Sequence, residues 1–508
     1  MFDFAIGILI LLVVGGLILI GKRSKASLHI VQLEGYETEN YKRWVDNNKE
    51  KAYSYNKSTE PVKKALVFTD RAKRLYITNL IVSFIPMLLV LIFYIIRDKT
   101  TIMSIVNIIV MTLVVALVNH FQPITLAWAN EITKPIEKNI NMGFYKSAQD
   151  KIKAREDLTV IGITGSFGKT STKFIIGDML EEKFNVLNTP ESYNTPMGLS
   201  IVINNELNSE HEIFIAEMGA KVIGEIKEVA KLAQPKIGVI TSIGPVHIET
   251  FINIENIMKT KYELIEELPS DGIAVFNYDN EYIKKLADKT FKEKILYGLE
   301  DIENLDIYAD DIVVSELGST FTLRDKEGNS ISCTTKLLGR HNIYNILAGA
   351  SVSKALGLSF EEISLGVSRV KPIPHRLNII NPGTGVIIID DAFNSNPIGA
   401  KAALEVLGQF KEGRKIIVTP GMIELGAMEV EANREFGNNI GKVCDYVILM
   451  GKIRTQPIYD GLMDVNYNPE NIFIVNNLDE ATVQIGKLAR PKDVILFEND
   501  LPDNYNEA

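Results

Sequence analysis

Three long apolar segments constrain the fold of this chain more than any other feature. They span about residues 4–20, 76–96 and 102–121, and none contains a charged side chain. Each is long enough to cross a bilayer core as a helix at about 1.5 Å per residue. The last two are separated only by RDKTT, and a buried soluble hairpin would not need such long uncharged runs. We therefore predict three transmembrane helices, the first an anchor rather than a cleaved signal because Asp3 precedes it.

The charges between these segments predict their orientation. Residues 21–75 contain 13 Lys and Arg against 7 Asp and Glu, and basic loops stay on the cytosolic side. Loop 22–75 and everything after about Gln122 are then cytosolic. Residues 28–51 mix aromatic and basic side chains and form either a helix on the membrane surface, in contact with lipid, or a solvated connector. We predict a multi-pass protein of the cell membrane, with residues 1–146 as the membrane domain and two cytoplasmic domains at 147–338 and 339–508.

Composition excludes several classes for the rest of the chain. With 46% hydrophobic and 23% charged residues it is neither disordered nor collagen-like. The net charge of −10 argues against a nucleic-acid partner, which would require a basic face. Two distant cysteines, Cys333 and Cys444, cannot form a zinc cluster of four thiolates and indicate a reducing compartment.

A phosphate-binding loop follows the first strand predicted after the membrane segments. Residues 158–164 are an apolar, β-branched run, followed by GSFGKTS and then a helical pattern. In such a loop the backbone N–H groups and the helix N-terminus face an anion, a lysine such as Lys169 reaches terminal phosphates, and a hydroxyl such as that of Thr170 ligates Mg²⁺. Ile163 stands where a strict Walker A loop has glycine. The alternative, a chance GKT turn, is disfavoured by the flanking strand and helix.

These residues resemble the Mur ligases, the ATP-dependent amide ligases of peptidoglycan synthesis. ITGSFGKTST is similar to the family's ATP loop, and IAEMGAK is similar to the motif whose glutamate holds Mg²⁺. The resemblance implies ATP and two Mg²⁺ ions as cofactors, and nucleotide and cell-wall precursor substrates as partners. It also implies ATP contacts from the loop residues Gly165, Ser166, Gly168, Lys169, Thr170 and Ser171.

The resemblance assigns metal-binding roles to four side chains: Thr170, Glu217, His247 and Lys261. His247 follows the strand-like segment IGVITSIGPV, and Lys261 lies in MKTKYELIEEL, where the family carbamylates a lysine. A lysine near two cations makes electrostatic sense only when its charge is removed. Lys259 is the competing candidate, but the spacing to Glu263 favours Lys261.

Later motifs imply the remaining contacts of nucleotide and substrate. NTPESYNTPMGLS resembles the family's loop over the phosphates and the acceptor carboxylate, in which Asn194 and Gly198 match. LLGRHNIYNILAG resembles the adenine-binding motif and assigns Asn342 and Asn345 to the base. Capping of a helix by Asn342 alone is the alternative reading of that motif.

The segment HRLNII and the strand-like GVIIIDDAFNSNP imply two further roles. Arg376 resembles the arginine at the terminal phosphate, which suits a planar bidentate donor, and Asp391 resembles the aspartate at the ribose. DDAFNSNP, together with Glu424 in VTPGMIELG, is close to the branch that adds D-alanyl-D-alanine to a UDP-muramoyl tripeptide. The catalytic assignments are then Lys169, His247, Lys261 and Arg376.

The alternation of KIIVTP, YVILMG, NIFIVN and DVILFEN with helical runs predicts a Rossmann-like C-terminal domain. The expected fold class is α/β: a central P-loop-type ATPase domain and a C-terminal Rossmann-like domain, preceded by an α-helical membrane domain of three spans. Three departures from the branch stand out. Membrane spans replace the domain that grips the UDP-sugar, and FENDLPDNY replaces a lysine-glycine-serine stretch. Asn433 also stands where that branch often has histidine.

The predicted function is an ATP-dependent amide ligase that activates a carboxylate as an acyl phosphate for attack by an amine such as D-alanyl-D-alanine. Because the sugar-binding domain is replaced, a lipid-linked or non-muramoyl substrate is the first alternative. A non-catalytic ATP-binding membrane protein is the second, and the second metal site disfavours it. A transporter is disfavoured because the three spans contain no charged pathway.

Overall fold

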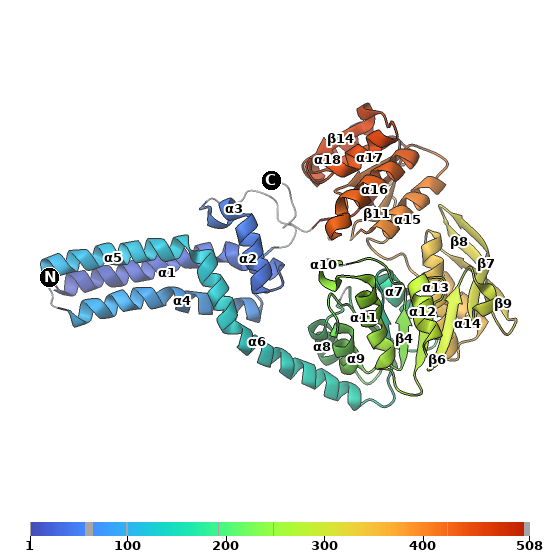
Figure 1. Cartoon of the computed structure of the whole chain (residues 1–508), viewed down its shortest axis with the longest axis horizontal. Helices are drawn as coiled ribbons and strands as arrows, with labels where there is room; N and C mark the ends of the chain where they lie inside the picture. Colours follow the sequence, from blue (N-terminus) through green and yellow to red (C-terminus); the bar gives the residue numbers. More distant parts are fainter. Residues whose placement is uncertain are drawn as a thin grey trace. The chain divides into compact units, whose positions relative to one another are not determined.

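The structure, a computed structural model, describes residues 2–55, 65–97, 100–191, 193–246, 248–393, 395–423 and 425–501. Two compact units divide the chain, Met1–Gly143 and Phe144–Leu501. Each unit has its own hydrophobic core. Figure 1 shows the helices and strands of both units.

Among its described residues the first unit contains helices, joined by turns and loops, and no strand. Helices α1 (Phe2–Leu33), α4 (Asp70–Ile96) and α5 (Thr101–His120) pack side by side (Figure 1). All three are candidate membrane spans by length and composition. Helix α1 continues 13 residues past the apolar run that predicts it, through GKRSK to Leu33. Residues 28–51 form the end of α1, all of α2 (Thr38–Asn47) and the start of α3 (Lys49–Tyr53), and α6 (Gln122–Lys153) follows α5.

A nine-stranded sheet forms the first domain of the second unit. Its order is β2-β3-β1-β4-β5-β6-β7-β8-β9, parallel up to β7 and antiparallel beyond it. Both faces of the parallel part are buried, as its continuous apolar runs predict. The strands are β1 (Thr159–Thr164), β2 (Val186–Asn188), β3 (Ile213–Glu217), β4 (Ile237–Ile240), β5 (Ile273–Asn277), β6 (Glu293–Gly298), β7 (Ile307–Ser315), β8 (Gly318–Asp325) and β9 (Ser330–Thr335).

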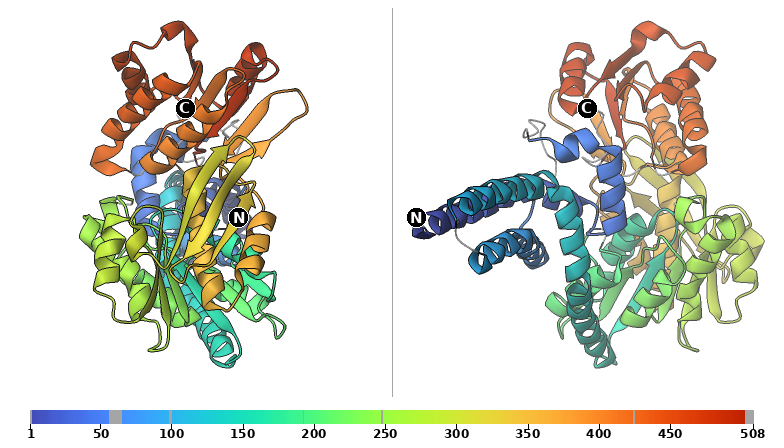
Figure 2. Two further views of the ribbon diagram at one scale, coloured as in Figure 1. Left: turned by 90° about the vertical axis from the view of Figure 1, so that its right-hand side faces the viewer. Right: turned by 60° about the vertical axis from the view of Figure 1, so that its left-hand side comes forward.

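Helices cover this sheet on two faces, which Figure 2 shows from the side. One core packs under α7, α13 and α14, and the other packs under α8, α9, α11 and α12. The helices and the short η1 are α7 (Lys169–Leu180), α8 (Pro196–Asn205), α9 (Glu225–Ala233), α10 (Ile248–Phe251), α11 (Ile254–Glu266), α12 (Glu281–Asp288), η1 (Ile302–Asn304), α13 (Arg340–Ala355) and α14 (Phe360–Arg369).

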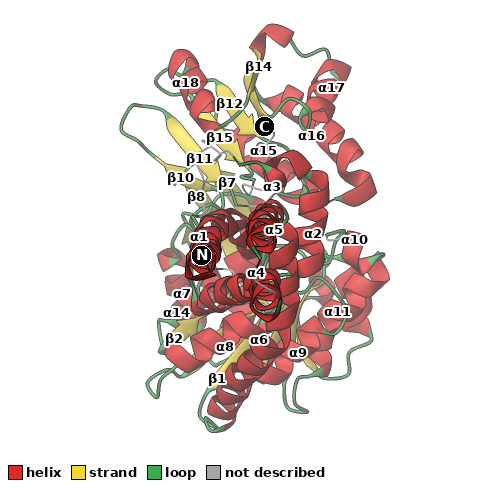
Figure 3. Ribbon diagram, turned by 90° about the vertical axis from the view of Figure 1, so that its left-hand side faces the viewer, coloured by secondary structure: helices red, strands yellow, loops and turns green. Residues whose placement is uncertain are grey.

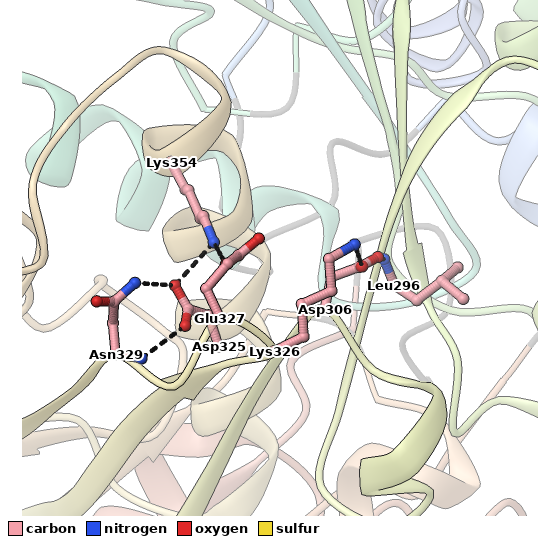
Figure 4. A network of polar contacts seen from close by, with 7 residues as sticks. All are labelled: Leu296, Asp306, Asp325, Lys326, Glu327, Asn329 and Lys354. Carbon is pink, nitrogen blue, oxygen red and sulfur yellow. Dashed lines mark hydrogen bonds and ion pairs between the residues drawn. The ribbon is translucent and has the colours of Figure 1, made fainter.

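A polar network ties α13 to the β8–β9 hairpin (Figure 4). Asp325 is 1% exposed and accepts hydrogen bonds from Lys354 at 2.7 Å and from the backbone and side chain of Asn329 at 2.9 and 2.8 Å. Lys354 also pairs with Glu327. Because α13 carries both predicted adenine-binding asparagines, this network fixes the far end of a helix that serves the site.

A six-stranded sheet of order β10-β11-β15-β12-β13-β14 forms the C-terminal domain, parallel except for β10. Figure 3 shows this sheet between α18 on one face and α15 to α17 on the other, in agreement with its two cores. The predicted fold class is confirmed. The elements are β10 (Asn378–Ile380), β11 (Ile387–Asp391), α15 (Pro397–Gln409), β12 (Lys415–Thr419), η2 (Gly426–Met428), α16 (Glu429–Val443), β13 (Tyr446–Met450), α17 (Gln456–Asp464), η3 (Pro469–Asn471), β14 (Ile472–Val475), α18 (Leu478–Leu488) and β15 (Val494–Glu498).

Candidate active site

The phosphate loop joins β1 to α7 and requires glycine at two positions. Gly168, the N-cap of α7, has φ +77°, and a Cβ there would lie 3.0 Å from Asn345 Oδ1. A Cβ on Gly165 would lie 2.1 Å from Thr241 Oγ1. Only glycine lets the backbone approach this closely and adopt the left-handed turn. The loop therefore presents backbone rather than side chains to whatever binds at the helix N-terminus.

Two hydroxyl residues that the sequence analysis missed hold this loop in place. Thr241 Oγ1 donates to the carbonyl of Phe167 at 2.6 Å, and Ser242 Oγ accepts from the amide of the same residue at 2.8 Å. Both follow the last residue of β4, which neighbours β1 in the sheet. Their position at the carboxyl end of a parallel strand was the available signal, because functional groups gather at that edge.

Lys169 lies at the start of α7, facing the loop. Its Nζ donates to the carbonyl of Gly165 at 2.8 Å. Burial lowers the pKa of Lys169, and the charge of Glu217 acts in the opposite direction. Among the described residues, the Lys169 ammonium group bonds to backbone carbonyls. It can exchange these carbonyls for a phosphate, because hydrogen bonds between two charged groups are stronger.

Glu217 ends β3 and is 1% exposed. Its Oε2 lies 3.1 Å from Nζ of Lys173, and its Oε1 accepts from Asn194 Nδ2 at 3.1 Å. Lys173 is fully buried and also donates to the carbonyl of Glu191. No sequence motif singled out Lys173, although it stands one helical turn after Lys169 on the same face. The predicted metal ligand is therefore tied both to the ATP-loop helix and to the predicted substrate loop.

Gly198 of that loop lies in the first turn of α8. Its amide donates to the side chain of the N-cap residue Thr195 at 3.2 Å. A Cβ on Gly198 would lie 3.3 Å from both Thr195 and Tyr193, so glycine eases a tight turn here. Asn194, four residues earlier, is the part of the loop that reaches Glu217.

Lys261 lies on α11 and is 3% exposed. Burial, followed by the nearby charge of Lys169, lowers the pKa of Lys261 to about 7. Lys259 is exposed. The carboxylate of Glu263 accepts hydrogen bonds from the amides of Gly224 at 2.7 Å and Lys227 at 2.9 Å, at the N-terminus of α9. The spacing that singled out Lys261 therefore reflects a helix contact.

His247 and Glu424 lie outside the described residues. Among the residues that the structure describes, no group of three or more His, Cys, Asp or Glu side chains is arranged to hold a metal ion. Of the predicted metal ligands, the described residues therefore include one carboxylate, one hydroxyl and one lysine: Glu217, Thr170 and Lys261.

Asn342 and Asn345 lie in the first two turns of α13 and contact each other. Asn345 Nδ2 donates to Asn342 Oδ1 at 3.0 Å, and Asn345 Oδ1 accepts from Thr172 Oγ1 at 3.1 Å. Asn342 Nδ2 reaches back to the carbonyl of Leu338 at 2.8 Å. The N-cap of α13 is Gly339, so Asn342 does not cap this helix. The pair joins α13 to the ATP-loop helix.

Arg376 is presented by a strained backbone segment. His375 and Leu377 on either side have φ +58° and +48°, a conformation that costs a non-glycine residue about 1–3 kcal/mol. The Arg376 guanidinium lies 4.3 Å from the ring centroid of Phe393, and His375 Nδ1 lies 2.8 Å from Asp390.

Asp391 ends β11, close to this arginine. Its Oδ1 accepts from the amide of Leu377 at 3.2 Å. Burial raises the pKa of Asp391, and the charge of Arg376 opposes that rise. Asn433, the departure from the branch pattern, is buried and bonded to both backbone groups of Met422.

One cleft is lined by residues of the phosphate loop and by Arg376. Seven predicted residues line it: Ser166, Gly168, Lys169, Thr170, Ser171, Asn194 and Glu217, and an eighth, Arg376, comes from the other domain of this unit. Six described residues of the prediction lie outside its lining: Gly165, Gly198, Lys261, Asn342, Asn345 and Asp391. The other lining residues were not predicted from the sequence: Phe167, Val246, Phe393, Ser395, Asn396, Ile423 and Leu425.

Comparisons with known proteins agree with this architecture. Residues 163–353 match the Mur ligase middle domain, and residues 375–498 match the Mur ligase glutamate ligase domain. The UDP-N-acetylmuramoyl-tripeptide–D-alanyl-D-alanine ligase of Buchnera aphidicola is 32% identical over 61% of this chain and 66% of its own length. That of Escherichia coli is 31% identical over 58% of this chain and 64% of its own.

A crystal structure of MurF ligase from Thermotoga maritima in complex with ADP superposes with a TM-score of 0.63. The two chains are 26% identical, and the superposition covers 71% of this chain and 80% of the other. Through its middle and C-terminal domains, this chain belongs to the Mur ligase family. It spans slightly less than two thirds of the length of the curated relatives described above.

Proposed function

We propose that this chain is an ATP-dependent acid–amino-acid ligase of the Mur type that forms an amide bond and releases ADP. In this proposal the chain has three parts: residues 1–146 are the membrane domain, 147–338 the ATP-binding domain and 339–508 the C-terminal ligase domain. The catalytic domains lie in the cytoplasm. The substrates are precursors of peptidoglycan or a related envelope polymer.

The observation that carries the proposal is the meeting of two cations from different domains in one cleft. Lys169 from the phosphate loop and Arg376 from the C-terminal domain line the same cavity, together with Thr170 and Glu217. A loop that tolerates no Cβ at Gly165 or Gly168 fits a phosphate chain held by backbone amides. Binding of a nucleotide alone would not require a second cation from another domain.

The chemistry follows from charge. A carboxylate is a poor electrophile, so its conversion to an acyl phosphate by ATP allows an amine to attack and form the amide. Lys169 and Arg376 neutralise the phosphoryl group in transfer and the charge that develops on attack. Closure of the C-terminal domain over ATP would keep water from the acyl phosphate.

Mg²⁺ fits the donor set on the protein side of the cleft. Thr170 and Glu217 would hold one ion, and His247 with a carbamylated Lys261 would hold a second. When bound, these ions supply positive charge to the phosphate oxygens. Burial of Lys261 supports its modification, because a carbamate replaces the buried cation with a carboxylate-like ligand.

The remaining nucleotide contacts are proposed from the family motifs. Asn342 and Asn345 would face the adenine and Asp391 the ribose, while Asn194 and Gly198 would lie over the acceptor carboxylate. The names of the curated relatives favour a UDP-muramoyl tripeptide and D-alanyl-D-alanine as the substrate pair. The three candidate membrane spans favour a second pair, in which the carboxylate is lipid-linked at the cytosolic face.

ADP release by the detergent-solubilised full chain with Mg²⁺ and ATP tests the proposal. One arm contains UDP-muramoyl tripeptide and D-alanyl-D-alanine, and the other contains a bacterial lipid extract and an amino-acid pool. We expect turnover in at least one arm, and its loss on chelation of Mg²⁺. Turnover with the first pair alone would exclude a lipid-linked substrate. Substrate-independent ADP release, or none in either arm, would contradict the ligase assignment.

A further inference from the structure

A buried glutamate at the end of the last strand has none of the roles proposed above. Glu498 is the last residue of β15 and is 1% exposed. In the parallel pairing of β11 with β15 it is the direct partner of Asp391. Partners in a parallel ladder place their side chains on the same face, so two carboxyl groups meet at this edge of the sheet.

The contacts of Glu498 form a directed series. Its Oε1 accepts from Ser395 Oγ at 2.5 Å, and the strand register places its carboxyl group beside that of Asp391. Asp391 accepts from the amide of Leu377. Glu498 Oε2 is buried and receives no hydrogen bond from any donor in the described part of the chain. Since two carboxylates have no proton to donate to each other, this arrangement is satisfied only when one of them is protonated.

The surrounding charges indicate which carboxyl holds the proton. Asp391 lies near Arg376, whereas Glu498 already accepts the hydroxyl of Ser395 and lies deeper in the domain. Burial and the adjacent Asp391 both raise the pKa of Glu498 well above its ordinary value, while Arg376 opposes the rise only weakly. The other nearby charge on β11, Asp390, is paired with His375.

We propose that Glu498 is a positioning residue whose proton is donated to Asp391, so that Asp391 is held as a fixed acceptor at the nucleotide ribose. The series runs from Ser395, which lines the cleft, through Glu498 to Asp391. Through these contacts, the position of Ser395 in the cleft wall fixes the position of Asp391 on the ribose side of the site. The inference rests on the proposed function for the role of Asp391, but the shared proton itself does not.

Affinity for ADP, measured by calorimetry on the solubilised full chain across pH 6.5 to 9.5, tests this role without any acceptor substrate. Loss of the shared proton leaves two adjacent buried negative charges, which displaces Asp391. For wild type, the affinity should therefore fall as the pH rises, by at most about tenfold per pH unit, the limit for one coupled proton.

Two substitutions separate positioning from mere packing. Glu498→Leu removes the donor and should weaken ADP binding at neutral pH. Glu498→Gln offers an amide N–H to Asp391 and an oxygen to Ser395, so it should restore most of that affinity and abolish the alkaline decline. The same decline in wild type and Glu498→Gln would overturn the proposal.

Asp493, buried at the opposite end of β15 and paired with Arg414 at 2.6 Å, provides the matched control. Asp493→Asn should lower the melting temperature and leave the pH dependence of ADP affinity as in wild type.

An infrared difference spectrum between wild type and Glu498→Gln at neutral pH should contain the C=O stretch of a protonated carboxyl. Its replacement by carboxylate bands would also overturn the proposal. If wild type binds no ADP at any pH, the proposed function fails, while the infrared result still decides the shared proton.

Discussion

At the scale of single residues, Lys169 is the cation that the phosphate loop itself supplies to the cleft. Its Nζ rests on the carbonyl of Gly165, and the other lysine of the same helix face, Lys173, is committed to Glu217. The loop backbone can hold phosphates without Lys169 but cannot neutralise their charge during transfer.

Lys169→Ala should therefore lower kcat by at least about 100-fold, the usual effect of losing one transition-state donor. ADP release under saturating ATP measures it. Lys183→Ala, a partly exposed lysine just after α7, is the control and should retain wild-type turnover. Turnover of Lys169→Ala close to wild type would contradict the assignment of Lys169.

Lys261→Ala tests the proposed carbamate. The variant should be nearly inactive and recover in part with added short carboxylates, which occupy the space of the missing group. Lys259→Ala is the matched control, because Lys259 lies two residues away and is exposed. An inactive Lys261→Ala that no small carboxylate restores, combined with an unmodified Lys261 by mass spectrometry of wild type, would rule out the carbamate.

At the scale of elements, the network between the β8–β9 hairpin and α13 couples stability to pH. Burial by itself would raise the pKa of Asp325, but hydrogen bonds from Asn329 and Lys354 lower it to about 2 (Figure 4). A depressed pKa in the folded state stabilises the protein above the ordinary pKa of 3.8, and that stability is lost as the pH falls toward 2. The shift corresponds to about 2 kcal/mol.

Lys354→Met should reduce the free energy of unfolding at pH 7 by about 1–3 kcal/mol, because Asp325 then keeps a buried charge without its cation. Its stability should also decline less between pH 4 and 2 than that of wild type. Denaturant unfolding followed by fluorescence measures both. Lys492→Met, which breaks an exposed pair with Glu412, should change stability by less than about 0.5 kcal/mol. Equal losses in the two variants would refute the role of the network.

At the scale of the whole molecule, the loop charges predict which side of the membrane each segment faces. Both native cysteines are buried and unpaired, so an introduced surface cysteine can report its own exposure. An impermeant maleimide added to intact cells should label a cysteine at Thr100, between α4 and α5. It should not label one at Lys42, which lies on α2 between the first two spans, until the cells are opened. Labelling of Lys42→Cys in intact cells would reverse the orientation and place the ligase domains outside.

The sequence by itself determined the elements that depend on neighbouring residues. Apolar runs of about 20 residues specify helices that a membrane accepts, and a strand, a glycine turn and a helix N-terminus specify the phosphate loop. The same local logic predicted alternating strands and helices in the second unit. These features could be read from the sequence because the interactions that form them lie within a few residues of each other.

Only the tertiary structure decided which distant side chains meet. Strand order brings Thr241 and Ser242 to the phosphate loop, and strand register brings Glu498 to Asp391. The tertiary structure also shows that the carboxylate of Glu263 binds amides at the N-terminus of α9, a contact that its spacing from Lys261 does not reveal. The partner of each of these groups depends on the order and register of strands far apart in the chain. Burial determines whether acids such as Glu498 and Asp391 are protonated, and no local sequence pattern specifies burial.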